Sequence, residues 1–272
     1  MHRNKLLNLL ASNRKRGEFR AETADTGNVI YLYDVIVASK VEAEWWGGVD
    51  AETFVQSLRG MSGDVTLRIN CPGGDVFAGR AMAQAIRDYP GQVTAHVDGY
   101  AASAASFITS AADRVVMADG SMLMIHKAWT MAWGNTDDLT ATAQLLGKID
   151  GTIAATYESA AKKRGVTCSA AEFTVLMAAE TWFTGPEAID HGLADEVAAD
   201  VVKPSAKWDF SAYANAPQAT SVTVEVTVEV EEGLEDPAED AAETETPNET
   251  PETEAMAQQR RNIAALRLKP PA

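Results

Sequence analysis

The sequence predicts an α/β protein in which parallel strands alternate with helices. Short apolar runs typical of buried strands are separated by segments of helical periodicity, and the connections between them are short. Such alternation builds βαβ units around a mostly parallel sheet. The predicted strands span 29–37, 65–69, 93–97, 115–117 and 121–125, and the predicted helices span 51–58, 76–88 and 103–112.

A long helix is predicted next, over residues 136–163. Apolar side chains recur at helical spacing from Leu139 to Tyr157, and Asp137 and Asp138 stand in the first turn, where the helix dipole favours acidic groups. The apolar stripe must be buried against another surface, and we expect a partner subunit to provide it.

Two capping boxes follow the long helix. Ser-x-x-Glu at 169–172 and Thr-x-x-Glu at 184–187 each predict a helix start, and Gly192 is expected to end the second helix.

A candidate nucleophile lies where the third strand gives way to a helix. Residues 99–106 read Gly-Tyr-Ala-Ala-Ser-Ala-Ala-Ser. Small side chains allow a sharp turn that leaves the hydroxyl of Ser103 exposed at a helix N-terminus, where free N–H groups favour developing negative charge. Runs of small residues also occur simply where helices pack closely, so the interpretation depends on what surrounds this one.

Two further features lie within about 55 residues of one another and complete a pattern for acyl transfer. The Pro-Gly-Gly turn at 72–74 follows a strand, and its glycines can turn main-chain N–H groups toward a ligand. His126 follows the apolar run 122–125. A serine, a histidine and a donor turn together fit catalysis by an activated serine.

With these motifs the chain resembles the Clp protease proteolytic subunit (ClpP) family, and within it the head maturation proteases of phages and prophages. The matching segments are Asn70-Cys71-Pro72-Gly73-Gly74, Gly99-Tyr100-Ala101-Ala102-Ser103, Met124-Ile125-His126, Thr181-Trp182-Phe183-Thr184-Gly185-Pro186-Glu187-Ala188 and Gly192-Leu193-Ala194-Asp195. The resemblance implies a ClpP/crotonase-like spiral of βαβ units, with the long helix as the handle where rings meet.

The resemblance also assigns roles to residues. It implies that Ser103 is the nucleophile, that His126 is the general base, and that the N–H groups of Gly74 and Ala104 form the oxyanion hole. The family's usual aspartate is replaced here by Glu180, which can still accept the Nδ1 proton of a histidine. The alternatives for this acid are Asp190 and Asp195.

Other chemistries remain open at this stage. The related signal peptide peptidases use a lysine base, for which Lys127 and Lys148 are the nearest candidates. Crotonase enzymes hold an acyl-CoA enolate in a similar oxyanion hole but need no serine at the helix start. Ser103 and His126 favour the serine–histidine mechanism over both. The tryptophans Trp129 and Trp133 are expected to contact the core or another subunit, although one of them is a candidate for lining a peptide groove.

Composition indicates a soluble protein of a reducing compartment. The 272 residues include only two cysteines, in no metal-binding spacing, and no apolar stretch approaches the ~20 residues of a membrane span. We therefore expect no metal, no cofactor, no membrane or nucleic-acid partner, and a location in the bacterial or host cytoplasm or in the prohead. The single Gly147-Lys148 pair lacks the spacing of a nucleotide-binding loop.

Charge and composition divide the chain into four parts. We expect a mobile basic segment at 1–27, a serine peptidase domain at 28–200, an acidic linker at 201–254 with a possible strand at 222–230, and a short helix at 255–272. Thirteen of the 39 acidic residues lie in 225–254, which has no lysine or arginine, so most of the net charge of −16 belongs to this tail. Its Glu, Thr, Pro and Ala content predicts disorder.

The sequence therefore predicts a serine endopeptidase that forms homo-oligomers, as a heptameric ring or stacked rings. The leading hypothesis is a phage or prophage head maturation protease that cleaves capsid or scaffold precursors. It rests on the Trp-Gly-Gly-Val-Asp run at 46–50, on the segment 180–184 and on the appended tail. The alternatives are a general proteolytic subunit that works with an ATP-driven unfoldase, and a non-catalytic capsid assembly or scaffold protein that keeps the fold.

Overall fold

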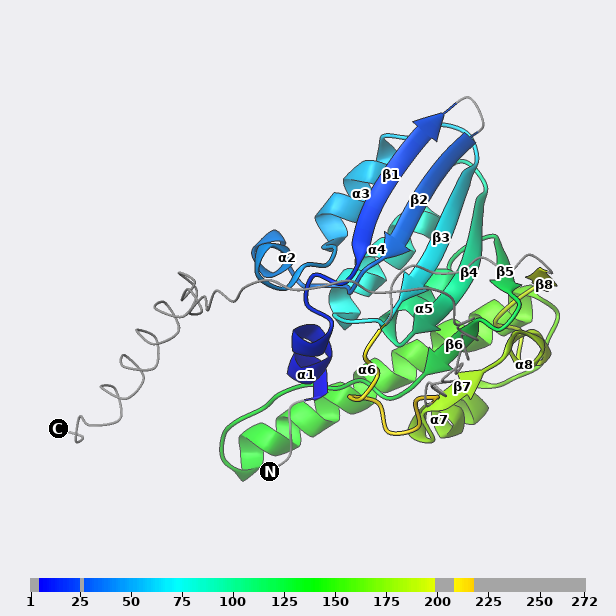
Figure 1. The fold of residues 1–272 in the computed structure, drawn as a ribbon. Helices are drawn as coiled ribbons and strands as arrows, with labels where there is room; N and C mark the ends of the chain where they lie inside the picture. The colour runs from blue at the N-terminus through cyan, green and yellow to red at the C-terminus, as the bar shows by residue number, and fades with distance from the viewer. Residues whose placement is uncertain (1–4, 25–26, 199–207, 218–272) are drawn as a thin grey trace, which may run out of the picture. The chain divides into compact units, whose positions relative to one another are not determined.

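The computed structural model describes residues 5–24, 27–198 and 208–217 (Figure 1). The chain divides into two compact units, Met1–Thr220 and Ser221–Ala272, and all of the described residues belong to the first. The possible strand at 222–230, the acidic stretch up to 254 and the helix expected at 255–272 lie outside the described residues.

The first unit is built on one eight-stranded sheet. The strands are β1 (Glu18–Ala24), β2 (Gly27–Tyr33), β3 (Val65–Cys71), β4 (Val93–Ala102), β5 (Arg114–Ala118), β6 (Met122–Ile125), β7 (Thr181–Phe183) and β8 (Glu196–Ala198). The main path runs β1-β2-β3-β4-β5-β8, and β6 pairs with both β4 and β7. Neighbours from β2 to β8 along this path are parallel, as the alternation of strands and helices predicts.

The helices are α1 (Lys5–Ser12), α2 (Lys40–Trp46), α3 (Ala51–Arg59), α4 (Val76–Arg87), α5 (Ala104–Thr109), α6 (Thr136–Lys163), α7 (Ala170–Ala178) and α8 (Gly185–Asp190). Helices α3, α4 and α5 pack one against the next, and α6 contacts both α5 and α7 (Figure 1). The apolar faces of these helices and of the parallel strands form one continuous core, whose largest members include Tyr157, Phe54 and Phe173. The predicted α/β class is confirmed.

Strand β4 changes partners along its length, and this change creates the site. Its first half, Thr94 to Val97, pairs with β5, whereas its last residues, Tyr100 to Ala102, pair with β6. The sheet therefore opens between β5 and β6 beyond the middle of β4. The carboxyl ends of β4 and β6 lie side by side there, so the residues that follow them come close together.

Helix α6 has two different halves. Its buried residues all lie between Ile153 and Ala161, in the half next to the core. In the other half, Leu139 and Leu145 are about half exposed, and this end extends away from the sheet (Figure 1). The helix spans the predicted residues 136–163, with Asn135 as a capping residue.

Within the segment 1–27, which we expect to be mobile, the described residues form a helix and a strand. Lys5–Ser12 form α1, and Glu18–Ala24 form β1, which pairs antiparallel with β2 over its whole length. Phe19 is the one large apolar side chain of β1 and packs against Phe54, with ring centroids 6.2 Å apart. Because the other side chains of β1 are small or polar, the strand has little apolar periodicity, and pairing at the sheet edge supplies its stability.

No helix in the described parts of the chain is both long enough and apolar enough to cross a lipid bilayer.

Candidate active site

Ser103 lies in the turn between β4 and α5, in an unusual backbone conformation. Its φ is 55° and its ψ is −120°, and its side chain makes no capping bond to the helix. Its N–H donates to the carbonyl of Met124 at 2.9 Å, which ties the turn to β6. A positive φ is strained for a residue with a Cβ, and such strain is typical of the turn that exposes a nucleophilic serine.

The Pro-Gly-Gly turn after β3 fits against this serine only because it lacks side chains. Gly73 and Gly74 have φ values of 94° and 144°. A Cβ on Gly73 would lie 2.7 Å from the Cβ of Ser103, and one on Gly74 would lie 1.9 Å from the carbonyl oxygen of Ile36. Ile36 also holds the turn by two hydrogen bonds of 2.9 Å. Its N–H donates to the carbonyl of Gly73, and its carbonyl accepts from the N–H of Asp75.

Two main-chain N–H groups remain available beside Ser103. Those of Gly74 and Ala104 have no protein acceptor among the residues that the structure describes. The amide nitrogen of Ala104 lies only 3.3 Å from where a Cβ on Gly73 would stand, so the turn and the start of α5 are neighbours. These are the two donors expected of an oxyanion hole.

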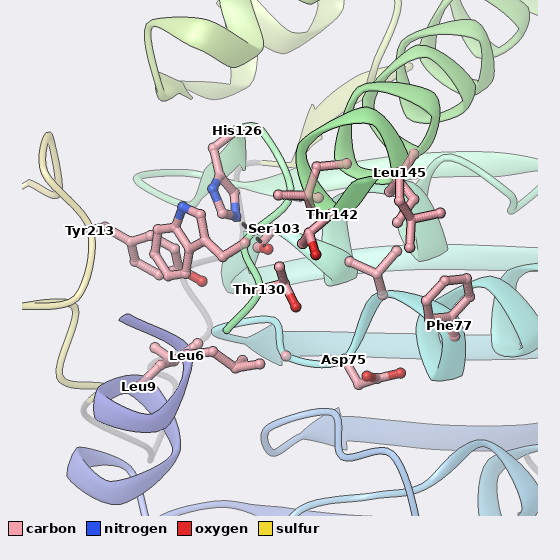
Figure 2. A pocket seen from close by; sticks show the side chains of 16 residues that line it. Leu6, Leu9, Asp75, Phe77, Ser103, His126, Thr130, Thr142, Leu145 and Tyr213 are labelled. Atoms are coloured by element: carbon pink, nitrogen blue, oxygen red, sulfur yellow. Dashed lines mark hydrogen bonds between the residues drawn. The ribbon is translucent and has the colours of Figure 1, made fainter. Parts of the chain in front are cut away.

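The structure brings His126 to Ser103. The Nε2 atom of the imidazole lies 2.7 Å from the Oγ atom of the serine (Figure 2). The pairing of Ala102 with Met124 explains the contact, because each residue is followed closely by one member of the pair. This distance is that of a hydrogen bond, and the serine hydroxyl donates in it when the neutral imidazole carries its proton on Nδ1.

The surroundings of His126 keep the imidazole neutral. Burial lowers its pKa to about 3, and the ammonium group of Lys5 acts in the same direction. The ammonium group of Lys5 lies 4.9 Å from the ring centroid of Trp129, and that ring contacts the imidazole edge-to-face at 4.4 Å. A neutral imidazole can accept a proton from the serine, as a general base must.

The other imidazole nitrogen has no partner in the described part of the chain. The Nδ1 atom of His126 is buried and makes no hydrogen bond. In the antiparallel pair of β6 and β7, Ile125 lies opposite Thr181, so His126 and Glu180 stand one step beyond that pair on facing chains. The Oε1 atom of Glu180 nevertheless accepts from the N–H of Asn215 at 2.6 Å. The structure thus places Glu180 beside the histidine but does not join the two by a hydrogen bond.

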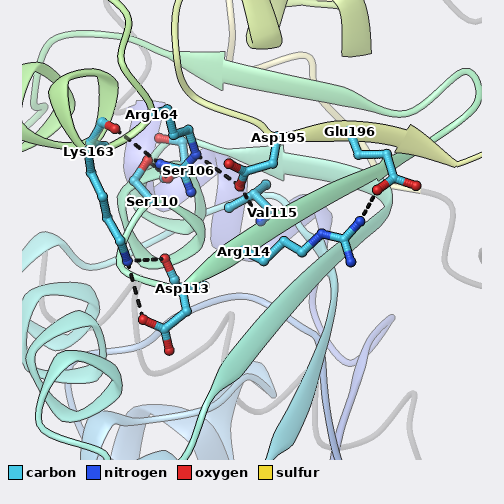
Figure 3. Close-up of polar contacts among 11 residues, drawn as sticks. Ser106, Ser110, Asp113, Arg114, Val115, Lys163, Arg164, Asp195 and Glu196 are labelled. Atoms are coloured by element: carbon cyan, nitrogen blue, oxygen red, sulfur yellow. Dashed lines mark hydrogen bonds and ion pairs between the residues drawn. The ribbon is translucent and has the colours of Figure 1, made fainter.

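The alternative acids and bases lie elsewhere. Asp195 accepts from the N–H of Val115 at 2.7 Å and from Arg164 at 3.0 Å, so it links β5 to the end of α6 (Figure 3). Asp190 is exposed at the end of α8. Lys127 and Lys148 are both exposed, and neither lines the cavity at Ser103. A lysine base therefore has no support in this geometry.

A cavity of about 170 Å³ opens at Ser103 and His126 (Figure 2). Apolar side chains from α1, α4 and α6 form most of its wall, namely Leu6, Leu9, Val76, Phe77, Leu145, Leu146 and Ile149. Trp129 also lines it, whereas Trp133 is 77% exposed and does not. In the described residues no cluster of histidine, cysteine, aspartate or glutamate could hold a metal ion.

Sequence reasoning missed one contributor to the site. Residues 208–217 were assigned to the acidic linker, but Tyr213 from this segment lines the cavity and stacks edge-to-face on His126, with ring centroids 5.4 Å apart. Composition could have indicated that this segment is folded. Three aromatic residues, Trp208, Phe210 and Tyr213, lie close together there, just before a stretch that has no aromatic residue.

Ser103 has a strained backbone and is hydrogen-bonded to a buried, neutral histidine. Two main-chain N–H groups without an acceptor in the described residues lie beside it. Serine hydrolases have this arrangement. Comparison with known families matches residues 29–201 to the Clp protease family, so the chain belongs to that family, whose members are serine peptidases.

Individual relatives agree with this assignment. An ATP-dependent Clp protease proteolytic subunit from Chlorella vulgaris is 30% identical over 190 residues, which cover 69% of this chain and 92% of the relative. One from Deinococcus radiodurans is 27% identical over 166 residues, which cover 60% and 78%. Among solved structures, a ClpP1 variant from Listeria monocytogenes matches with a TM-score of 0.51 at 19% identity, over 63% of this chain and 91% of that one. The expected ClpP-like fold is confirmed.

Proposed function

We propose that this protein is a serine endopeptidase of the Clp type. The hydroxyl oxygen of Ser103 attacks the carbonyl carbon of the scissile bond while Nε2 of His126 takes its proton. His126 then returns the proton to the leaving amine, and a water molecule hydrolyses the acyl-enzyme by the same route. The observation that carries the proposal is the 2.7 Å contact between these two residues.

Two further roles complete the proposed mechanism. The N–H groups of Gly74 and Ala104 stabilise the oxyanion of the tetrahedral intermediate, which is worth several kcal/mol of activation free energy in comparable enzymes. Glu180 accepts a hydrogen bond from the Nδ1–H group of His126 and stabilises the imidazolium while staying ionised. Its support is its place opposite His126 in the β6–β7 pair. The N–H of Asn215 donates to one oxygen, Oε1, of the same carboxylate.

The proposed partners follow from the surface and from the relatives. We propose a homo-oligomer, a heptameric ring or stacked rings, in which the exposed leucines of the outer half of α6 are buried between subunits. The relatives are named as ATP-dependent proteolytic subunits, which supports an ATP-driven unfoldase as a second partner.

A second candidate is maturation of phage heads by cleavage of capsid or scaffold precursors. The feature that favours it is the acidic stretch that follows residue 201, where the family match ends. A protease that trims assembled precursors needs no unfoldase, so the two candidates differ in their requirement for ATP.

Cleavage of an unstructured protein tests the proposal. Wild-type protein is expected to degrade a casein-like substrate, whereas Ser103→Ala lowers the rate by at least about a thousandfold. Ser62→Ala, at an exposed position far from the cavity, serves as the control and keeps the wild-type rate. Equal rates for Ser103→Ala and wild type would overturn the proposal. Adding an ATP-driven unfoldase with a folded substrate, or a capsid precursor without ATP, separates the two candidate functions.

A further inference from the structure

Residues 208–217, which we call the strap, are fixed to the N-terminal part of the domain. The side chain of Asn13, at the end of α1, pairs with the main chain of Asp209, donating to its carbonyl at 2.9 Å and accepting from its N–H at 2.7 Å. The indole N–H of Trp208 donates to the carbonyl of Asn70 at 3.1 Å. These contacts join residues 196 and 138 positions apart in sequence, so the strap is part of the folded domain.

The strap inserts Tyr213 beside the reacting groups. The phenol is 4% exposed, and its hydroxyl donates to the carbonyl of Pro72 at 2.6 Å, directly before the two glycines of the oxyanion turn. Its ring packs on both His126 and Trp129 (Figure 2). Burial raises the pKa of this phenol, and the neighbouring hydroxyl of Ser103 lowers it. Tyr213 and the nucleophile therefore line the same cavity.

The space that remains at Ser103 is smaller than a typical ligand-binding site. Sites that enclose drug-sized ligands have volumes of about 300–1,000 Å³, and the cavity between Tyr213 and α6 has about 170 Å³. An extended peptide must continue on both sides of its scissile bond, and one wall of this cavity is Tyr213 itself. The cavity has room for a side chain or a small reagent, and Tyr213 of the strap closes one side of it.

The strap also holds the acid. The N–H of Asn215 donates to Glu180, and the side-chain amide of Asn215 donates to the carbonyl of Ala179 at 2.7 Å. At the same time the Nδ1 atom of His126 is buried without a partner in the described residues. An acceptor and a buried nitrogen without a described partner thus lie on facing chains, and Asn215 of the strap holds one carboxylate oxygen, Oε1, of the acceptor in its present orientation.

We propose that the strap is an autoinhibitory element that covers the substrate path with Tyr213 and keeps Glu180 from His126 through Asn215. This inference rests on the proposed peptidase function. In the resting chain the site holds a serine–histidine pair, and displacement of the strap both opens the path and frees Glu180 to bind Nδ1. Asn215 acts through Glu180 and is a positioning residue.

Substitution at Asn215 tests the coupling. Asn215→Pro removes the N–H that Glu180 accepts, while Asn215→Ala keeps that N–H and loses only the side-chain amide. With a fluorogenic peptide as substrate, Asn215→Pro is expected to raise kcat/KM by at least about tenfold, because orienting the histidine is worth up to about 10⁴ in kcat. Asn215→Ala gives a smaller rise. A second substitution, Glu180→Gln, should cancel the gain of Asn215→Pro.

Trp208→Ala provides an independent variant, because it loosens the strap at its other end without touching the site. It should raise kcat/KM in the same direction. If both variants fold, judged by circular dichroism, and cleave no faster than wild type, the strap is not inhibitory and the proposed function stands. A gain that persists with Glu180→Gln would overturn the role of Asn215. If neither wild type nor any variant cleaves peptides, the proposed function fails with the inference.

Discussion

The Nε2 atom of His126 lies 2.7 Å from the Oγ atom of Ser103, although 23 residues separate them in the chain. The parallel pairing of β4 with β6 sets this distance, since Ala102 and Met124 are register partners. The pair therefore rests on sheet geometry rather than on a loop, which keeps the two side chains in a fixed orientation. Glu180 also lies next to a strand, since it directly precedes β7, but no described hydrogen bond joins it to His126.

The tightest backbone contact of the site is at Gly74. Gly74→Ala places a Cβ within 1.9 Å of the carbonyl oxygen of Ile36 at a φ of 144°. We expect a loss of about 3 kcal/mol in the free energy of unfolding, together with loss of peptide cleavage. Gly63→Ala is the matched control, since its φ is 81° but no atom lies within 4 Å of the added Cβ. It should cost about 1 kcal/mol. If urea unfolding shows the same loss in the free energy of unfolding for Gly74→Ala and Gly63→Ala, the proposed clash with Ile36 is wrong.

The buried imidazole makes stability depend on pH. The folded pKa of His126 is lowered to about 3 from 6.5, so between these values the unfolded chain binds a proton that the folded chain excludes. This contribution to stability is complete above about pH 6.5 and is lost as the pH falls, by up to about 1.4 kcal/mol per pH unit. Urea unfolding of wild type and His126→Gln at about pH 7 and pH 5 measures it. If the glutamine variant loses as much stability as wild type, the imidazole is not the cause.

The backbone conformation of Glu180 destabilises the fold, and this effect can be measured separately from the role of its carboxylate in catalysis. Its φ is 51°, a conformation in which glycine is favoured over any residue with a Cβ. We expect Glu180→Gly to be more stable than Glu180→Ala by about 1 kcal/mol, while both variants lose the carboxylate and show equally reduced cleavage. Thermal unfolding and peptide hydrolysis of the two variants test this together. Higher activity in the more stable variant would show that Glu180 serves the fold and not the reaction.

The apolar cavity predicts the side chain that the site accepts. Leucines of α1 and α6 line it, so a substrate with leucine next to the scissile bond gains about 1.5–3 kcal/mol by burial. In a peptide series, leucine should be preferred over glycine or aspartate by at least about tenfold in kcat/KM. Ile149→Trp fills the cavity and should remove the preference for leucine. Val175→Trp, on the exposed face of α7, should not. An unchanged preference in Ile149→Trp would place the substrate elsewhere.

Much of the fold could be predicted because it depends on local patterns. Parallel buried strands are continuous apolar runs, and α6 carries a capping residue, an acidic first turn and a sustained periodicity, so its bounds agree with the prediction. Strand β1 could not be predicted in this way. Its sequence gains order only from the edge of β2 and from the contact of Phe19 with Phe54.

The site likewise has parts that local sequence patterns predict and a part that they do not. Ser103, His126 and the glycine turn stand at strand ends, where sequence motifs and topology both place them. The strap escaped prediction because its contacts are non-local, since Tyr213 meets Pro72 and His126 across 141 and 87 residues of chain. Composition marked residues 201–254 as one acidic linker, although Phe210 and Tyr213 of the strap pack in the cluster around Met124 and Trp208 packs in the cluster around Val35.

Covalent labelling of Ser103 tests the central claim most directly. A small fluorophosphonate fits the cavity and reacts only with a serine whose hydroxyl is activated by a base. After incubation with the full chain, peptide mapping by mass spectrometry is expected to find the adduct on Ser103, with none in Ser103→Ala and a strongly slowed reaction in His126→Ala. A folded wild-type protein that carries no adduct on Ser103, or a His126→Ala variant that reacts as fast, would contradict a serine–histidine peptidase.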